Sequence, residues 1–410
     1  MVLNLLLFGS LLVTRTELPA ASEVPAVTRP SDAEVESLQT ETQESESPDE
    51  WLIMKSLPET QRDWLQDHRL QVYGWTEVSF TASSADNGQL PMGFNHRAND
   101  FLLQQNWLRL ERSVETDAAD PTFGFLADVI LPGSDYRFTL SRGLMDGQLT
   151  DDAGGPVRYG IDPVQFYAQF YFPSLAQGLD VKVGRIFGQY GVETINTPPN
   201  ALASHSYTFI YDPFTHTGVV TTLQLTDDWS TQTGVVMGPD VFIDPAASPY
   251  GMFSVKWAPP EGSDSVLIAG ILGSGQFDVA EQFNNPNIID LVYTHAFNSE
   301  WSYSLDALYG YQTDVPGVGI ATWFGVVNYL RYKFCDDVSG TTRLEFFDDE
   351  DGNRTGSKGL YTAVTAGLNW QVRKDIILRP EVRYDNNNKS QPFEGSHDLF
   401  TAAVDVIVRW

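Results

Sequence analysis

Side chains alternate between apolar and polar along the last stretch of the chain, HDLFTAAVDVIVRW, and this period of two constrains the fold most. Successive side chains of a β-strand point to opposite faces. One face of this segment carries the charged residues Asp405 and Arg409. The other face is wholly apolar and consists of Phe400, Ala402, Val404, Val406, Val408 and Trp410. The pattern predicts a strand with one apolar face and one polar face.

The same alternation recurs in segments spread over the chain. The alternation covers most positions of LYTAVTAGLNWQVR, residues 360–373. In PVQFYAQFYF, residues 163–172, it assigns Val164 to the apolar column. In EWSYSLDALYGYQ, residues 300–312, Leu308 is the one apolar residue that falls on the polar face. Repetition over the whole chain predicts an all-β protein.

Sixteen segments of this kind are predicted, and their lengths suit strands that cross a bilayer, which need about 9–11 residues. The expected strands lie near 69–80, 101–113, 122–131, 163–172, 179–187, 216–226, 229–237, 251–257, 264–273, 288–297, 300–312, 320–334, 338–348, 360–373, 376–385 and 398–410. We expect short and long connections to alternate throughout. The long ones include 132–162, 188–215, 238–250, 274–287, 349–359 and 387–397.

A sheet in hydrocarbon must close on itself, because no water is present to satisfy the backbone groups of an open edge. A barrel of sixteen strands is too wide for side chains to fill and leaves an aqueous lumen. The fold class expected for residues 69–410 is therefore a closed antiparallel transmembrane β-barrel. Its apolar columns would meet the lipid bilayer and its polar columns would meet water.

The first 68 residues differ in composition from the rest. Residues 2–13 form an apolar stretch, and small residues follow at Ala20 and Ala21, so residues 1–21 are predicted to be a signal peptide. Residues 22–68 are predicted to be an acidic disordered linker with a short helical part near 51–67. No run of apolar residues is long enough for a transmembrane helix.

The composition excludes several classes of function. A formal net charge of −29 disfavours nucleic-acid binding, which needs a basic surface. Cys335 is the only cysteine, so neither a disulfide within the chain nor a thiolate metal site can form. No motif for a cofactor, a metal or a catalytic centre occurs. The acidic stretch FDDEDGNRTG, residues 347–356, lacks the spacing of a calcium loop and is expected to be a solvated outer loop.

Charged residues fall on the inward column of the C-terminal strands and are candidates for lining a pore. They are Arg331, Lys333, Arg343, Glu345, Arg379, Glu381, Arg383 and Asp405. Facing water, they would set a field that filters solutes by charge and size. The alternative is that they form ordinary cross-strand ion pairs without a role in selectivity.

The connection 188–215 is long without being charged or of low complexity, and long ordered loops are usually functional. We expect it to fold into the lumen and narrow the pore. The alternative is an external cap on the barrel. The candidate constriction residues are Gly188, Gly191, Glu193, Asn196, Asn200, His205, Tyr207 and Tyr211. The 132–162 connection is a second candidate for an inward loop.

The chain resembles a family of β-barrel porins related to OmpL-like outer-membrane proteins. The resemblance covers roughly 70–410 and is carried by GQYGVETINTPPN (188–200), SHSYTFIYDPFTHTG (204–218), LRPEVRYD (378–385) and the C-terminal strand. It implies an outer-membrane porin and brings no catalytic residues with it. The last residue is Trp410, where such barrels usually end in Phe, and an aromatic there is the expected signal for the barrel-insertion machinery.

The function expected is that of a passive channel for small hydrophilic solutes in the outer membrane of a Gram-negative-type bacterium, without enzyme activity. Porins of this size are often trimers, so a homotrimer is considered. One alternative is a surface barrel that does not conduct and whose outer loops bind a partner. A remote alternative is a barrel-wall hydrolase, for which the neighbours Ser204 and His205 are the residues to test.

Overall fold

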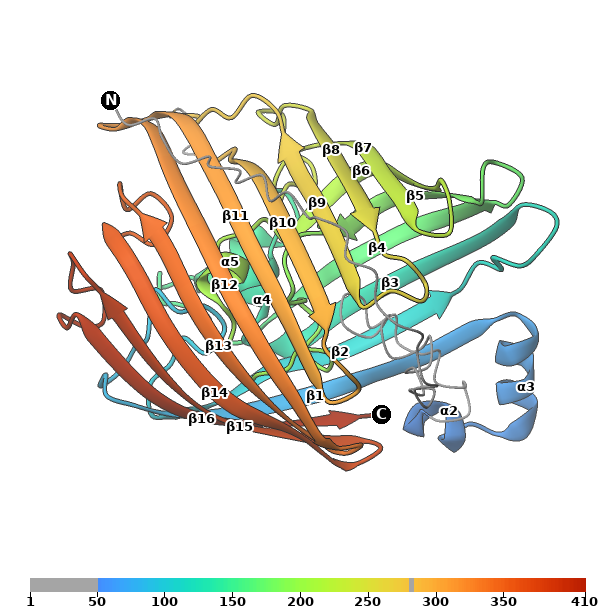
Figure 1. The fold of residues 1–410 in the computed structure, drawn as a ribbon, viewed down its shortest axis with the longest axis horizontal. Coiled ribbons are helices and arrows are strands. Elements are labelled where there is room, and N and C mark those ends of the chain that lie inside the picture. The colour runs from blue at the N-terminus through green and yellow to red at the C-terminus, as the bar shows by residue number, and fades with distance from the viewer. Residues whose placement is uncertain (1–50, 280–283) are drawn as a thin grey trace, which may run out of the picture.

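The computed structural model describes residues 51–279 and 284–410, which form a closed barrel of sixteen antiparallel strands (Figure 1). Each strand pairs with its neighbours along the chain, and the first pairs with the last. The predicted fold class and strand number are confirmed. The predicted signal peptide, 1–21, and most of the predicted acidic linker, 22–50, lie outside the described residues.

The strands differ in length, and those of the C-terminal half are mostly the longer ones. They are β1 (Leu70–Ser83), β2 (Asp100–Arg112), β3 (Thr122–Gly133), β4 (Gly160–Phe172), β5 (Leu179–Phe187), β6 (Thr215–Gln224), β7 (Trp229–Val236), β8 (Tyr250–Trp257), β9 (Asp264–Leu272), β10 (Asn287–Ala296), β11 (Trp301–Val315), β12 (Gly319–Cys335), β13 (Val338–Asp349), β14 (Gly359–Arg373), β15 (Ile376–Asn387) and β16 (Asp398–Arg409).

The period of two decides which face of each strand meets lipid. On β16, Phe400 is exposed on the outside while Thr401 and Asp405 are buried on the inside. On β14, Val364 is exposed and Thr365 is buried. Exposure of these apolar side chains to water would cost free energy, whereas their contact with hydrocarbon does not. The alternation therefore places the barrel wall in a membrane.

Closure of the barrel depends on the last residue of the chain. The backbone N–H of Trp410 donates to the carbonyl of Gly74 at 2.8 Å, and the N–H of Gly74 donates back at 2.9 Å. The indole Nε1–H donates to Thr76 Oγ1 at 3.0 Å. A Cβ at position 74 would lie 2.0 Å from the carbonyl oxygen of Trp107 and 2.6 Å from the indole. Glycine is thus required where the two ends of the sheet meet.

Aromatic residues gather on the outer face near both ends of the strands, as in the girdles of outer-membrane barrels. At the end with the short turns, Trp229 lies beside Trp257 and Trp301 lies beside Tyr332, with ring centroids 6.5 and 4.6 Å apart. At the other end, exposed aromatic side chains include Tyr309, Phe324, Phe346, Tyr384 and Phe400. The girdles mark where the wall meets the two membrane surfaces.

Connections do not alternate in length throughout, which corrects the expectation from the sequence. β11 and β12 are joined by residues 316–318 only, at the end where the other connections are long. Gly317 and Gly319 adopt φ values of 77° and 88°, which permit this tight reversal. At the opposite end, β2 and β3 are joined by the longer segment 113–121.

Val164 faces the lumen, whereas its column in the sequence pattern predicts a lipid contact. The register between β3 and β4 shifts by one residue here, because Asp128 pairs with Gln165 while Ile130 pairs with Asp162. Such a bulge reverses the faces on either side of it. Val164 is buried in an apolar cluster inside the barrel, so its assignment from the pattern was wrong.

Four short helices and a 3-10 turn complete the described chain. α2 (Leu52–Ser56) and α3 (Glu59–Asp67) lie beside β1 and the C-terminus, at the short-turn end of the barrel (Figure 1). Trp51 stacks on the inward ring of Tyr73 with centroids 4.0 Å apart. α4 (Tyr136–Thr139), the 3-10 turn (Asp146–Leu149) and α5 (Tyr207–Ile210) lie in long connections. No helix in residues 51–279 and 284–410 has the length and apolarity to cross a membrane.

Candidate functional site

The connection 188–214 runs inside the barrel and places α5 against β11, β12 and β13 (Figure 1). Ser206 caps this helix, since its Oγ accepts a hydrogen bond from the backbone N–H of Phe209 at 3.2 Å. Around α5 the loop meets charged side chains that point inward from the wall. This contact region is the candidate functional site.

Arg343 on β13 joins the wall to the loop. Its guanidinium donates to Glu345 Oε1 at 2.7 Å on its own strand and to Glu193 Oε1 at 2.9 Å on the loop. It also donates to the carbonyl oxygen of Ser204 at 2.6 Å and to Ser204 Oγ at 3.0 Å. All the hydrogen bonds of this planar cation except those to Glu345 and Thr365 go to loop residues. Arg343 therefore fixes the loop to the wall, and a loop held in this way is called seated below.

Glu193 is the acidic counterpart on the loop. Besides Arg343, its carboxylate accepts hydrogen bonds from His205 Nδ1 at 2.6 Å, Tyr329 Oη at 2.7 Å and the Ser206 N–H at 3.1 Å. Burial opposes ionisation of this carboxyl, but Arg343 and the hydrogen bonds from His205 and Tyr329 hold its pKa at about 2. Glu193 is therefore a carboxylate at neutral pH.

Arg379 and Arg383 on β15 hold two further parts of the loop. Arg379 donates to the carbonyl oxygens of Thr197 and Asn200 at 2.9 and 2.8 Å. It is also paired with Asp405 on β16 and, at 3.3 Å, with Glu77 on β1. Arg383 donates to the carbonyl oxygen of His205 at 2.6 Å and pairs with Asp385 at 2.8 Å.

Wall carboxylates bind backbone N–H groups of the same loop. Glu381 Oε2 accepts from the N–H groups of Ala203 and Ser204 at 2.9 and 3.0 Å. Glu345 Oε2 accepts from the Tyr207 N–H at 2.9 Å, and Asp385 accepts from the Tyr207 hydroxyl at 2.9 Å. Acids and bases of β13 and β15 thus recognise carbonyl and amide groups of the loop backbone.

The remaining residues predicted from the sequence lie at the edges of this region. Arg331 borders a cavity of about 80 Å³ between the loop and the wall, and its Nε donates to Ser339 Oγ at 3.3 Å. Lys333 lies near the short-turn end and pairs with Asp336 at 3.0 Å. Asn196 contributes its carbonyl oxygen to a hydrogen bond from Thr194 at 2.8 Å.

Three predicted loop residues make contacts away from the arginines. Gly188 packs against Tyr190 and His216, and the Gly191 N–H donates to Asp290 Oδ2 at 2.6 Å. Tyr211 donates its hydroxyl to the carbonyl oxygen of Pro91 at 2.7 Å, which links the loop to the neighbouring loop 84–99. Its own carbonyl oxygen accepts from Arg354 at 2.6 Å.

The stretch 347–356 differs from the solvated acidic loop expected from its sequence. Asp349 is fully buried and accepts hydrogen bonds from the N–H groups of Asn353, Arg354 and Thr355 at 2.7–3.0 Å. Arg354 turns inward and lies over the ring of Trp323 at 5.0 Å. The composition of the segment gave no sign that one of its aspartates would hold the turn together.

Sequence reasoning confined the inward charges to the C-terminal strands and missed an equivalent set on the N-terminal ones. Arg185 pairs with Asp162 at 2.8 Å and donates to the carbonyl oxygen of Thr139, the last residue of α4, at 2.6 Å. Arg109 pairs with Asp128 at 2.6 Å. Because a charge on the lipid face costs about 2–4 kcal/mol at the midplane, a charged residue within an apolar segment is the signal that could have revealed them.

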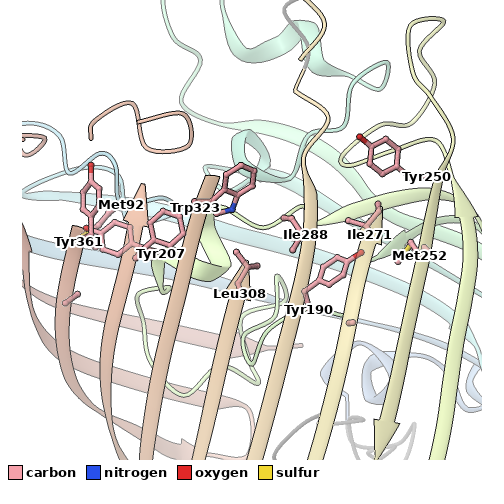
Figure 2. Close-up of a cluster of buried hydrophobic side chains, with 14 of the residues drawn as sticks. Met92, Tyr190, Tyr207, Tyr250, Met252, Ile271, Ile288, Leu308, Trp323 and Tyr361 are labelled. Atoms are coloured by element: carbon pink, nitrogen blue, oxygen red, sulfur yellow. The ribbon is translucent and has the colours of Figure 1, made fainter. Parts of the chain in front are cut away.

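Apolar side chains of three loops pack together inside the barrel. Phe94 from loop 84–99 contacts Phe138 of α4 and Phe209 of α5, with ring centroids 4.8 and 5.7 Å apart. Figure 2 shows Leu308 on the inner face of β11, among wall residues and the loop residue Tyr190. Leu308 interrupts the alternation of its strand because the neighbouring lumen is filled by a loop rather than by water.

The neighbours Ser204 and His205 do not form a catalytic pair. Ser204 Oγ accepts hydrogen bonds from Arg343 and Arg383, and His205 Nδ1 is bound to Glu193. The ring of His205 stacks on Phe209 with centroids 4.3 Å apart. Both side chains are therefore engaged in fixing the loop.

Comparison with known proteins identifies the family. Residues 69–410 match the family described as "Putative beta-barrel porin-2, OmpL-like". No curated protein matches the chain. Among solved structures, the anion-selective porin from Comamonas acidovorans has a TM-score of 0.55 at 10% identity, over 83% of this chain and 99% of that one.

Two further outer-membrane proteins are similar in fold. The outer-membrane channel DcaP of Acinetobacter baumannii has a TM-score of 0.55 at 12% identity, over 83% of this chain and 97% of its own. The trimer form of OmpT from Vibrio cholerae has a TM-score of 0.54 at 11% identity, over 83% and 99% of the two chains. The chain therefore belongs to the OmpL-like beta-barrel porin-2 family and is an outer-membrane porin of a Gram-negative-type bacterium.

Proposed function

We propose that this porin passes small hydrophilic solutes by passive diffusion, through a lumen sized by the loop 188–214 and biased by lumen charges. The observation that carries the proposal is the seating of this loop on Arg343, Arg379 and Arg383 of the wall. A loop fixed at several points inside a barrel reduces its free cross-section. Solutes larger than the remaining gap are excluded.

Polar side chains line the lumen between the loop and the short-turn end, which suits hydrophilic solutes. Small hydroxyl residues of β11 and β13 point inward here, namely Ser302, Ser304, Ser339 and Thr341. Small side chains leave room for water, and their hydroxyls replace part of the hydration of a passing solute. This half of the barrel is the proposed vestibule.

Hydrolysis is not part of the proposed function. The hydroxyl of Ser204 faces two guanidinium groups, and the imidazole of His205 is held between Glu193 and Phe209. A nucleophile needs a base within hydrogen-bond reach that removes its proton. Ser204 and His205 are proposed as residues that position the loop.

We also propose the assembly steps that the sequence suggests. Trp410 would act as the signal that the barrel-insertion machinery reads, and its pairing with Gly74 would then close the barrel. Residues 1–21 would direct export, and 22–68 would form a periplasmic linker that ends in α2 and α3. The related fold of an outer-membrane protein solved in a trimer form supports a homotrimer as the working state.

Planar-bilayer recording tests the proposed function. Purified porin is expected to add discrete conductance steps in KCl, and neutral sugars of increasing size should stop entering at a sharp limit. Correctly folded protein that gives no steps would instead favour a surface barrel whose long loops bind a partner. Chemical crosslinking of the protein in outer-membrane vesicles separates a trimer from a monomer.

A further inference from the structure

A groove lies between α2, α3 and the start of β1, at the short-turn end of the barrel (Figure 1). It has a free volume of about 580 Å³, and ligand sites in proteins typically measure about 300–1,000 Å³. Its lining is mainly apolar and includes Ile53, Leu57, Thr60, Trp64, Leu65 and Val72. None of the described residues that line it is charged. The groove therefore suits an apolar ligand.

The two helices are held on the rim of the barrel by a small apolar cluster. Trp51 stacks on the inward ring of Tyr73 with centroids 4.0 Å apart, and Met54 is fully buried in the same cluster. Ile53 and Leu57 pack against this cluster and also line the groove. The cluster thus fixes one wall of the groove to β1, and the groove is part of the fold.

Helix α3 turns an uncharged face towards the groove. Thr60 and Trp64 are one helical turn apart, and Leu65 lies beside them on the same face. The lining does not include the charged residues of this helix, which are Glu59, Arg62, Asp63 and Asp67. The side chain of Trp64 is 54% exposed. An apolar ligand in the groove would remove part of this large ring from water.

The groove is continuous with the lipid-facing surface of the wall. Val72 follows the outer column of β1, since its neighbour Tyr73 points inward. It pairs with Leu110 of β2, which is exposed on the outer face. Farther round this face, the exposed rings of Phe123 on β3 and Phe170 on β4 lie 5.4 Å apart. A hydrocarbon chain can therefore pass from the bilayer into the groove without crossing water.

We propose that this groove holds an acyl chain of a phospholipid from the membrane leaflet that borders the short turns. In outer-membrane barrels these turns lie on the periplasmic side. The bound lipid would fasten α2 and α3 to the membrane surface, with Trp64 at the level of the headgroups, where tryptophan is commonly found. The site rests on the position of the wall in the membrane and is independent of conduction through the lumen.

The chemistry of the lining favours a lipid over a segment of protein. A peptide carries backbone N–H and C=O groups that need hydrogen-bond partners when they are buried. The groove offers few such partners, because the hydroxyl of Ser56 in its lining already donates to the carbonyl oxygen of Ile53 at 2.7 Å. An acyl chain needs none, and its burial against Leu57, Leu65 and Val72 is favourable.

Quenching by brominated lipid tests whether acyl chains reach Trp64. Wild-type porin and Trp64→Phe are refolded into vesicles of dioleoylphosphatidylcholine and into vesicles of the same lipid brominated on its chains. The difference between the two tryptophan emissions is due to Trp64, and we expect it to fall strongly in the brominated vesicles. Trp323→Phe is the control, because Trp323 is 1% exposed inside the barrel and its emission should be equal in both lipids. An emission of Trp64 that bromine leaves unchanged would refute the proposal.

Retention of lipid separates the groove from the rest of the barrel wall. Porin extracted in mild detergent is analysed by native mass spectrometry, and we expect one phospholipid per chain to stay bound. Leu65→Ser removes part of the groove wall, and Thr60→Trp fills the groove from an exposed position, so each should weaken retention about tenfold. Leu52→Ser, on α2 but outside the lining, is the matched control and should retain lipid as the wild type does.

Three outcomes of this measurement overturn the proposal. The wild type retains no phospholipid, both groove variants retain as much as Leu52→Ser, or the retained mass is that of a peptide. Thr60→Trp does not touch the packing on Tyr73, so it keeps the test decisive if Leu65→Ser loosens the helices. A porin that conducts but retains no lipid refutes the site and leaves the proposed function intact, whereas a barrel that retains lipid but does not conduct refutes only the proposed function.

Discussion

Replacing Glu193 by glutamine should loosen the inward loop, because this carboxylate carries the loop's contact with Arg343. Glutamine has nearly the same shape but no charge, so Arg343 loses one of its two anionic partners and keeps Glu345. The hydrogen bond from His205 at 2.6 Å also loses its charged acceptor. The loop remains seated on Arg379 and Arg383, so we expect a mobile loop rather than an unfolded barrel.

The magnitude follows from the pKa of Glu193. Its surroundings lower the pKa from 4.5 to about 2, which at 1.36 kcal/mol per pH unit corresponds to about 3 kcal/mol in favour of the seated loop. Because the pKa is lowered, this contribution is fully present above pH 4.5 and is lost as the pH falls towards 2. At neutral pH, the ratio of seated to released loop should fall by about two orders of magnitude in Glu193→Gln.

Single-channel recording at pH 7 detects the change. The variant should show a larger mean conductance and more open-channel noise than the wild type, since the loop leaves its seat on Arg343 part of the time. Glu350→Gln removes an exposed charge from the β13–β14 connection and serves as the control, with the behaviour of the wild type expected. If Glu193→Gln had the conductance and noise of the control, the carboxylate would not hold the loop.

Four further predictions concern the barrel and its loops. Gly74→Ala should abolish most refolding into detergent, seen as loss of the heat-modifiable band in gel electrophoresis, whereas Gly147→Ala, with nothing near its Cβ, should refold normally. Deletion of Trp410 should slow assembly, because it removes both backbone hydrogen bonds to Gly74; normal assembly rates in vesicles would contradict this. Val364→Arg, on the lipid face, should lower the unfolding free energy in denaturant by about 2–4 kcal/mol, while Gln371→Arg on the inner face should change it little. Burial raises the pKa of Asp240 to about 6, so its contribution opposes folding as the pH rises from 4 to 6, and Asp240→Asn should stabilise the barrel above pH 6 but not at pH 4.

Alternation alone predicted the barrel, because long stretches of the chain obey it without a break. On β13 the buried residues Arg343 and Glu345 alternate with the outward Leu344 and Phe346, and the sequence pattern has the same two columns. Because lipid lies on one side of the wall and a filled lumen on the other, the sequence shows which face of the sheet each side chain occupies. The pattern fails where the backbone departs from a regular strand.

Bulges and loop contacts account for what the sequence could not predict. Arg185 shares a column with the lipid-facing Val183, but the backbone at Gly184, with a φ of 146°, turns it into the lumen. The hydrogen bonds of Gly191 to Asp290 on β10 and of Val192 to Asp306 on β11 depend on the path of the loop through the barrel. No local pattern encodes that path, since it results from contacts between residues about a hundred positions apart.

The distribution of counterions over the lumen decides which charges can act on a solute. Arg343, Arg379 and Arg383 are fully buried, and each is surrounded by carboxylates and by carbonyl oxygens of the loop. Their fields are therefore largely neutralised where the loop sits. Asp212 has no such partner, and burial and the neighbouring Asp290 raise its pKa well above the ordinary value, so this carboxyl adds little negative charge to the lumen near neutral pH. It follows that Asp212→Asn should leave the reversal potential in a KCl gradient close to that of the wild type, because it removes a carboxyl that is already neutral; a clear shift towards the chloride potential would show that Asp212 is charged.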